Sequence, residues 1–138
     1  MKDRGFIDTN VFVYAILDDP SHPAQRKKAV NLILNSTIEA VISTQVINEL
    51  YNVLLRNGIS DFNIQERIGE IIENTEIMVI SIETIQASWK IREKYKYSYW
   101  DSLIISSAIA AKCTTLFTED MQNKQLIENS LRIINPLQ

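Results

Sequence analysis

Short apolar runs typical of β-strands alternate with longer helical segments along this chain of 138 residues. Strands are expected at the start of the apolar run 5–15 and at residues 37–43, 76–82, 115–118 and 131–134. Helices are expected between them, at residues 23–34, 44–56, 60–73, 83–96 and 99–112. Because parallel strands need long crossover connections, this order predicts an α/β fold with a mainly parallel central sheet flanked by helices, an α/β/α sandwich.

Chain length and composition are those of a single folded domain, which we expect to span residues 1–138. Hydrophobic residues make up 46% of the chain and charged residues 22%, a balance that argues against a disordered protein. No apolar stretch approaches the roughly 18 residues of a membrane span. We therefore expect a cytoplasmic protein without a membrane partner.

Four acidic residues occupy related places in this pattern. Asp8 lies near the end of the first expected strand, and Asp120 follows the strand at residues 115–118. Glu49 and Asp101 are expected in the first turns of helices, where the helix dipole favours anions. Because parallel sheets form their sites at the carboxyl ends of strands, the sequence predicts that all four acids meet at one edge.

Converging carboxylates point to a metal site. Like charges at close range push one another toward protonation, and a divalent cation removes that repulsion. Oxygen-only ligands select Mg²⁺ or Mn²⁺, whereas zinc prefers Cys and His ligands. Cys113 and His22 are the sole residues of their types, so the sequence disfavours both a zinc site and a Cys–His nucleophile pair.

The order and spacing of the acids resemble a PIN domain of the VapC toxin type, over essentially the whole chain. The matching segments are Phe6-Ile7-Asp8-Thr9-Asn10-Val11, Ser43 through Glu49, Trp100-Asp101-Ser102-Leu103-Ile104, Leu116-Phe117-Thr118-Glu119-Asp120 and Leu131-Arg132-Ile133-Ile134-Asn135-Pro136. One departure bears on the occupancy of the metal site: Asn123 stands where many relatives carry a further acid.

The resemblance implies Mg²⁺- or Mn²⁺-dependent hydrolysis of RNA phosphodiesters by the toxin component of a toxin–antitoxin pair. On this interpretation Asp8 and Asp101 are the principal metal ligands and Glu49 binds directly or through water. Asp120 serves a second metal site or binds through water. Side chains that could orient these carboxylates are Thr9, Asn10, Ser43 or Thr44, and Thr118. The antitoxin would be a separate chain.

Each acid also has an ordinary structural interpretation. Asp8 could cap a helix or be a buried hydrogen-bonded acid, and Glu49 could be a solvated helix residue. Asp101 could be a simple acid at a helix N-terminus, and Asp120 a turn residue. Glu119 is interpreted as solvated.

Two groups of residues close to Asp101 in sequence could contact RNA. The basic group is Lys90, Arg92, Lys94 and Lys96, and the aromatic group is Tyr95, Tyr97, Tyr99 and Trp100. A solvated helix face explains the first group more simply, because Glu93 interrupts it. Core packing explains the second, above all for Trp100, so neither group is included in the predicted site.

The segment 44–56 carries more apolar residues than a single buried stripe requires. These residues are Val46, Ile47, Leu50, Tyr51, Val53, Leu54 and Leu55. Because exposed apolar surface commonly marks a binding site, we expect a homodimer interface, a groove for the antitoxin, or both.

Three other classes of protein fit part of the pattern. An aspartate-based phosphatase or phosphotransferase usually has a second acid two residues after the nucleophile, where this chain has Asn10. A response-regulator receiver would carry a lysine after a late strand, which Thr118-Glu119-Asp120 does not provide. A noncatalytic RNA-binding or scaffold protein of PIN-like fold would have no need for four converging acids.

Overall fold

A six-stranded sheet forms the centre of the fold in the computed structural model, which describes residues 2–138. The strand order is β3-β2-β1-β4-β6-β5, and every neighbouring pair is parallel except β5 and β6. The strands are β1 (Asp3–Ile7), β2 (Ile38–Ser43), β3 (Glu76–Met78), β4 (Thr115–Phe117), β5 (Leu126–Ile127) and β6 (Leu131–Ile134). The mainly parallel sheet predicted from the alternation of elements is confirmed.

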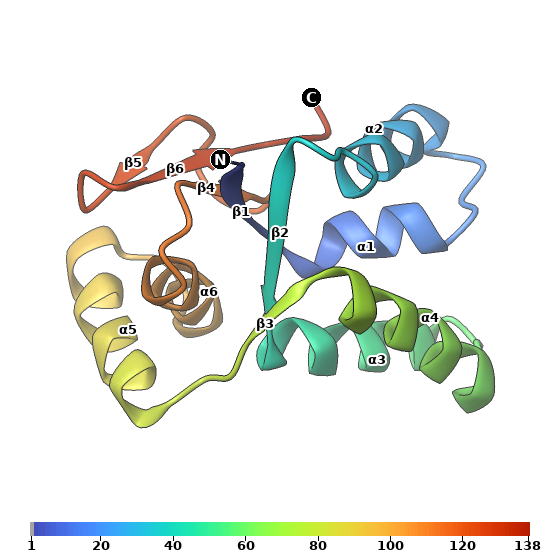
Figure 1. Cartoon of the computed structure of the whole chain (residues 1–138), viewed down its shortest axis with the longest axis horizontal. Helices are drawn as coiled ribbons and strands as arrows, with labels where there is room; N and C mark the ends of the chain where they lie inside the picture. The colour runs from blue at the N-terminus through green and yellow to red at the C-terminus, as the bar shows by residue number, and fades with distance from the viewer. Residues whose placement is uncertain (1) are drawn as a thin grey trace.

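Helices cover both faces of the sheet, which completes the α/β/α sandwich. Figure 1 shows α5 and α6 together on one side, and α1 to α4 on the other. The helices are α1 (Thr9–Ile16), α2 (Pro23–Ile33), α3 (Thr44–Arg56), α4 (Asp61–Asn74), α5 (Ile82–Tyr95) and α6 (Tyr99–Ala110). Among the helices of residues 2–138, none combines the length and the apolarity that crossing a membrane requires.

The apolar run 5–15 is divided between β1 and α1, a helix that its β-prone composition did not predict. The chain leaves β1 at Asp8, whose Oδ1 accepts a hydrogen bond from the backbone N of Thr9 at 2.7 Å and so caps α1. Val11 and Phe12 of α1 are buried like the strand residues before them. In a continuous apolar run, the spacing of hydrophobic residues does not distinguish a buried strand from a buried helix. The sequence therefore shows no sign of α1.

Two further boundaries differ from the sequence-based expectation. The strand expected at residues 76–82 ends at Met78, because Ser81 caps α5 with its Oγ accepting from the backbone N of Thr84 at 3.3 Å. The short strand β5 was not predicted; it is the one antiparallel neighbour in the sheet.

The apolar residues of α3 are mostly covered by the protein's own helices. Val46, Leu50 and Leu54 are buried, and α3 packs against both α1 and α4. Of the seven apolar residues named above, Leu55 is the exposed one. The composition of α3 therefore reflects two internal contacts, and it does not by itself indicate a surface for a partner.

Gly5 fixes how closely the central strands approach. A Cβ at this position would lie 2.7 Å from Cε2 of Phe117 on β4 and 3.0 Å from Cγ2 of Ile38 on β2. β1 lies between β2 and β4, so moving it to make room for a Cβ would break its hydrogen bonds to one of these two strands. The strand that carries Asp8 thus depends on a residue without a side chain.

Gly5→Ala should lower the free energy of unfolding by about 1–3 kcal/mol, the usual cost of overpacking a core. Gly69→Ala is the control: it lies in α4 with no heavy atom within 4 Å of the added Cβ. That control should be more stable than the wild type by up to about 1 kcal/mol, because alanine favours helix. Urea denaturation measures both changes, and unchanged stability of Gly5→Ala would contradict the close contact.

Candidate metal centre

The carboxyl edge of the sheet collects the four acids from four separate elements. Asp8 directly follows β1, and Asp120 follows β4 after two residues. Asp101 lies in the first turn of α6, as predicted. Glu49 lies in the second turn of α3, not in the first turn as expected, and α3 continues from β2 without a gap.

Asp8 is held in one orientation by hydrogen bonds to both carboxylate oxygens. Its Oδ1 accepts from the backbone N of Thr9, and its Oδ2 accepts from Oγ1 of Thr118 at 2.8 Å. Its backbone N donates to the carbonyl oxygen of Phe117 at 3.0 Å. A carboxylate has about four lone-pair positions, so these bonds fix Asp8 and still leave it able to bind a cation.

Thr118 links Asp8 to Asp120. The Thr118 hydroxyl donates to Asp8, and its Oγ1 accepts from the backbone N of Asp120 at 3.2 Å. Asn10 then holds the other end of the link, because its Nδ2 donates to Oδ2 of Asp120 at 3.0 Å. The side chains of Asn10 and Thr118 therefore contact these carboxylates as the sequence suggested. Thr9 does so only through its backbone N, and Thr44 Oγ1 instead accepts from the backbone N of Ile80 at 3.4 Å.

The helices that carry Glu49 and Asp101 are tied together near these acids. The Oγ of Ser98 accepts from the backbone N of Asp101 at 3.1 Å, which caps α6. Gln45, one turn before Glu49, donates from its Nε2 to the carbonyl oxygen of Trp100 at 3.2 Å. The start of α6 is thus tied to the helix that carries Glu49.

Burial raises the pKa of three of the four acids, and the charges of neighbouring acids add to the rise. Burial raises the pKa of Asp8 to about 7, against the hydrogen bonds from Thr9 and Thr118, and the charges of Asp120 and Glu49 raise it further. Partial burial raises the pKa of Glu49, with the charges of Asp101 and Asp120 adding to it. Burial also raises the pKa of Asp101, and the charge of Asp120 acts in the same direction. These are neighbouring carboxylates that lack a counter-charge.

Within residues 2–138, no three acidic, His or Cys side chains form a preassembled metal-ligating group. The chemistry of the edge nevertheless fits a hydrated cation. Four buried polar atoms close in sequence to the acids have no hydrogen-bond partner among the described residues: Thr9 Oγ1, Ser43 Oγ, Gln45 Oε1 and Ser102 Oγ. Unpaired oxygens beside an all-oxygen set of carboxylates suit Mg²⁺ or Mn²⁺ with its bound water.

Glu119 also belongs to this region, although its sequence context suggested a solvated side chain. It is half-buried, burial raises its pKa, and the charge of Asp120 adds to that rise. A cleft of about 300 Å³ beside the acids is lined by Asn10, Val13, Tyr14, Leu17, Asp19, His22 and Glu119. No sequence signal distinguished Glu119, because its burial depends on α1 folding against the end of β4.

Asn123 and Cys113 have structural roles. The Oδ1 of Asn123 accepts from the backbone N of Asn135 at 2.8 Å, and its Nδ2 donates to Oε1 of Gln138 at 3.0 Å. Asn123 therefore holds the C-terminal segment. Cys113 is buried, and burial raises its pKa to about 12, so it offers no thiolate nucleophile.

A model of the PIN domain family matches residues 5–126. The chain belongs to the PIN domain family. The resemblance drawn from the acidic segments is thereby confirmed, and with it the α/β/α fold. No curated protein matches the chain in sequence.

Solved structures share the fold of this PIN domain at low sequence identity. VapC20 of Mycobacterium tuberculosis, a Sarcin-Ricin loop cleaving toxin, has a TM-score of 0.68 and 14% identity, covering 84% of this chain and 91% of that one. A toxin-antitoxin complex from Klebsiella pneumoniae has a TM-score of 0.69 and 18% identity, covering 96% and 97%. VapBC2 from Rickettsia felis, bound to a DNA fragment from its promoter, has a TM-score of 0.66 and 24% identity. The match covers 96% of this chain and 99% of that one.

Metal-free Asp8→Asn should be more stable than the wild type at about pH 8 and no more stable below about pH 4. Folding raises the pKa of Asp8, so the folded wild type is penalised when this carboxyl ionises. The free energy of unfolding of the wild type therefore falls as the pH rises from about 4 to about 7, whereas that of Asp8→Asn does not. The gap of about three pKa units corresponds to at most about 4 kcal/mol. Thermal unfolding in EDTA across this pH range measures the difference.

The control for this experiment is Glu83→Gln, which should behave in the opposite sense. Hydrogen bonds from its own backbone N and from Ser81 lower the pKa of the exposed Glu83, so its ionised form favours the fold. Replacing it should therefore cost stability at neutral pH and cost less as the pH falls. A pH-independent difference between Asp8→Asn and the wild type would contradict the perturbed state of Asp8.

Proposed function

We propose that this PIN domain is a divalent-metal-dependent endoribonuclease that acts in the cytoplasm as the toxin component of a toxin–antitoxin pair. The observation that carries the proposal is the set of mutually repelling carboxylates of Asp8, Glu49, Asp101 and Asp120 at one edge of a parallel sheet. Carboxylates whose pKa is raised by burial and by neighbouring negative charge cost stability when ionised, unless a cation binds them. Membership of the PIN domain family supports the same conclusion.

The residues divide into those that would hold Mg²⁺ or Mn²⁺ and those that orient them. Asp8 and Asp101 are the proposed principal ligands, with Glu49 binding directly or through water and Asp120 serving a second site or binding through water. The bound metal would stabilise charge on the phosphate oxygens and lower the pKa of an attacking water.

The protein's own contacts prepare this site before substrate arrives. Thr9 and Thr118 fix both oxygens of Asp8, so that carboxylate needs no reorganisation when it binds a cation. Asn10 donates to Oδ2 of Asp120, which orients this carboxylate toward its proposed role as a second-site or water-mediated ligand. No histidine is required as a general base, and His22 instead pairs with Asp19 at 2.8 Å.

Purified wild type should cleave a pool of structured RNAs in Mg²⁺ or Mn²⁺ and not in EDTA. Asp101→Asn should lower the rate at least about 100-fold, because loss of even a supporting group costs about 10–100-fold at a metal site. Glu83→Gln is the matched control, since it removes an acid from the first turn of α5, and it should keep full activity. Gel analysis of end-labelled RNA measures all three.

Two outcomes of this experiment would contradict the proposal. Equal cleavage by the wild type and Asp101→Asn would assign the activity to a contaminating nuclease. Absence of cleavage, together with a melting temperature that ignores Mg²⁺ and Mn²⁺, would favour the noncatalytic RNA-binding or scaffold protein.

The proposal includes two protein partners, an antitoxin and a second copy of the chain. Solved structures with this fold include toxin-antitoxin complexes, which supports an antitoxin as a separate chain. Large apolar side chains that remain exposed, such as Phe62, Val79 and Ile82, provide surface for a partner.

The purified chain should sediment as a dimer at micromolar concentration, because exposed apolar side chains favour association. Val79→Asp combined with Ile82→Asp should shift it to monomer. The exposed pair Lys27→Gln and Lys28→Gln on α2 is the control, because it makes the net charge more negative by the same amount. Sedimentation equilibrium measures the change. A wild type that stays monomeric at high micromolar concentration would contradict the homodimer.

A further inference from the structure

Both tryptophans of the chain are exposed. Trp89 on α5 has a relative exposure of 52% and Trp100 on α6 one of 62%. Core packing was expected for Trp100, and that expectation is wrong. Tryptophan is highly buried on average, because its large ring gains most from leaving water. Two exposed tryptophan rings, one on α5 and one in the first turn of α6, therefore suggest a surface that receives a ligand.

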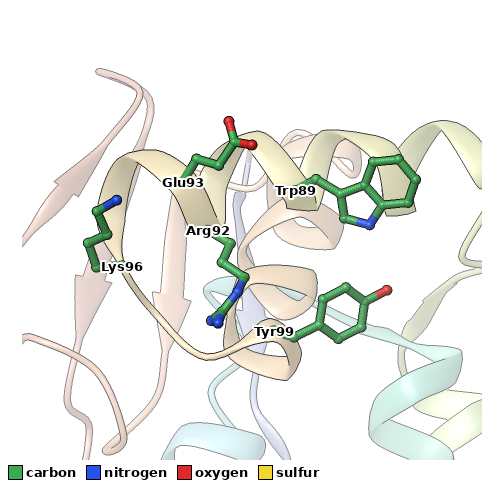
Figure 2. Close-up of a pocket in the computed structure, with 5 residues that line it drawn as sticks. All are labelled: Trp89, Arg92, Glu93, Lys96 and Tyr99. Carbon is green, nitrogen blue, oxygen red and sulfur yellow. The ribbon is translucent and has the colours of Figure 1, made fainter.

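A cavity of about 520 Å³ lies between the last turns of α5 and the start of α6. Its lining residues are Trp89, Arg92, Glu93, Lys96 and Tyr99, which we call the aromatic-basic pocket. Figure 2 shows the rings of Trp89 and Tyr99 extending to the same side, whereas the carboxylate of Glu93 points away from them. The Tyr99 ring meets Trp100 edge to face at 5.1 Å, which connects the pocket to the residue before Asp101.

The two cations of the aromatic-basic pocket lack a carboxylate partner. Within residues 2–138, the ion pairs involve Arg4, His22 and Lys94 as the basic members. Arg92 donates from Nη1 to the carbonyl oxygen of Tyr97 at 2.7 Å, which holds its guanidinium near the start of α6. Lys96 ends α5 in the left-handed conformation with φ of 65°. Both charges therefore remain available to an anion.

The neighbouring basic and aromatic residues are used by the fold itself. Lys94 pairs with Glu128 at 2.8 Å, and the Tyr95 hydroxyl donates to the same carboxylate. The Tyr97 hydroxyl donates to Oε1 of Gln125. The structure thus separates the residues near Asp101 into a structural set and the set exposed at the pocket.

We propose that the aromatic-basic pocket binds an unpaired segment of the RNA substrate. A base stacks on Trp89 or Tyr99, and the adjoining phosphates contact Arg92 and Lys96. Stacking on aromatic rings combined with a basic groove is how proteins bind single-stranded nucleic acid without reading its sequence. This inference rests on the proposed ribonuclease function, because it assigns the substrate's path to the same site.

Electrostatics and connectivity both favour this occupant. The carboxylates at the metal centre repel phosphates, so RNA needs cations nearby to approach, and Arg92 and Lys96 supply them. The hydrogen bond from Gln45 to the Trp100 carbonyl ties the pocket to the helix that carries Glu49. The cores of protein–protein interfaces are depleted in lysine, which favours RNA over a protein at Lys96.

Intrinsic fluorescence tests the pocket directly, because Trp89 and Trp100 are the protein's two tryptophans. The experiment uses the Asp101→Asn protein to prevent cleavage, and titrates it with a single-stranded oligouridylate of about ten nucleotides. The single strand should quench the emission, and an RNA duplex of equal length should not. Trp89→Ala in the same background should weaken binding about tenfold, as loss of one stacked base implies.

A pair of lysine variants separates binding from folding. Lys96 and Lys112 are both exposed, and both have positive φ, at 65° and 61°. Glycine is favoured in that conformation, so neither Lys96→Gly nor Lys112→Gly should destabilise the protein. Lys96→Gly should weaken RNA binding and lower the slope of log K against log salt by about 0.7. Lys112→Gly, near the start of β4 at the opposite edge of the sheet, should change neither.

Each remaining outcome decides the inference. RNA affinity that changes with neither Lys96→Gly nor Trp89→Ala would overturn the inference. Emission that depends on protein concentration and ignores RNA would identify the pocket as a protein interface and overturn it as well. Metal-dependent cleavage by the wild type, without quenching of the Asp101→Asn protein, would overturn the pocket and leave the proposed function intact. Quenching of Asp101→Asn by single strands, with no cleavage by the wild type and no effect of Mg²⁺ or Mn²⁺ on its melting temperature, would support the pocket and overturn the nuclease.

Discussion

The burial of an ionisable carboxylate at Asp8 is the constraint on which the rest of the site depends. Asp8 is 6% exposed, and burial raises its pKa to about 7 even though two hydrogen bonds favour the ionised form. Its charge is therefore costly in the protein alone, and Glu49 and Asp120 increase that cost. A bound cation attracts the ionised carboxylates and offsets their repulsion. Ionised acids at this edge therefore destabilise the protein without a metal and would favour binding of one.

The parallel sheet makes such an edge possible. β1 lies at the centre with β2 and β4 on either side, so the segments after these three strands emerge next to one another. Figure 1 shows α1 and α3 leaving this edge on one side of the sheet, with α6 on the other. Acids far apart in the sequence thus become neighbours without any one helix or loop carrying the whole site.

The close packing of α5 and α6 has a second consequence for function. It places Trp100 and Asp101 at the start of a helix whose first turn is tied to α3, and it opens the aromatic-basic pocket beside them. A surface suited to unpaired nucleotides then adjoins carboxylates suited to metal. Of the four acids, Asp101 lies closest to this pocket in the sequence, in the first turn of α6, whereas the other three come from the ends of β1 and β4 and from α3.

Sequence patterns were informative where one local signal decided the structure. The helix expected at residues 60–73 forms over Asp61–Asn74, because Ser60 is a good capping residue and its Oγ accepts from the backbone N of Asn63 at 3.2 Å. The hydrophobic pattern failed to predict α1, because its apolar residues are continuous with those of β1. It also suggested a partner surface on α3, whose apolar residues instead pack against α1 and α4. Trp100 was misjudged because a bulky aromatic residue is usually buried, whereas its ring is 62% exposed in the fold.

The sequence by itself determined the alternation of strands and helices and the family, and it predicted the oxygen ligands of the proposed metal site. These follow from hydrophobic runs, from the near absence of Cys and His, and from the spacing of the acids. The tertiary structure alone decided that Asp120 influences all of Asp8, Glu49 and Asp101, and that Glu119 joins them. Coulombic coupling and burial depend on distances between elements, and no local pattern along a chain encodes those distances.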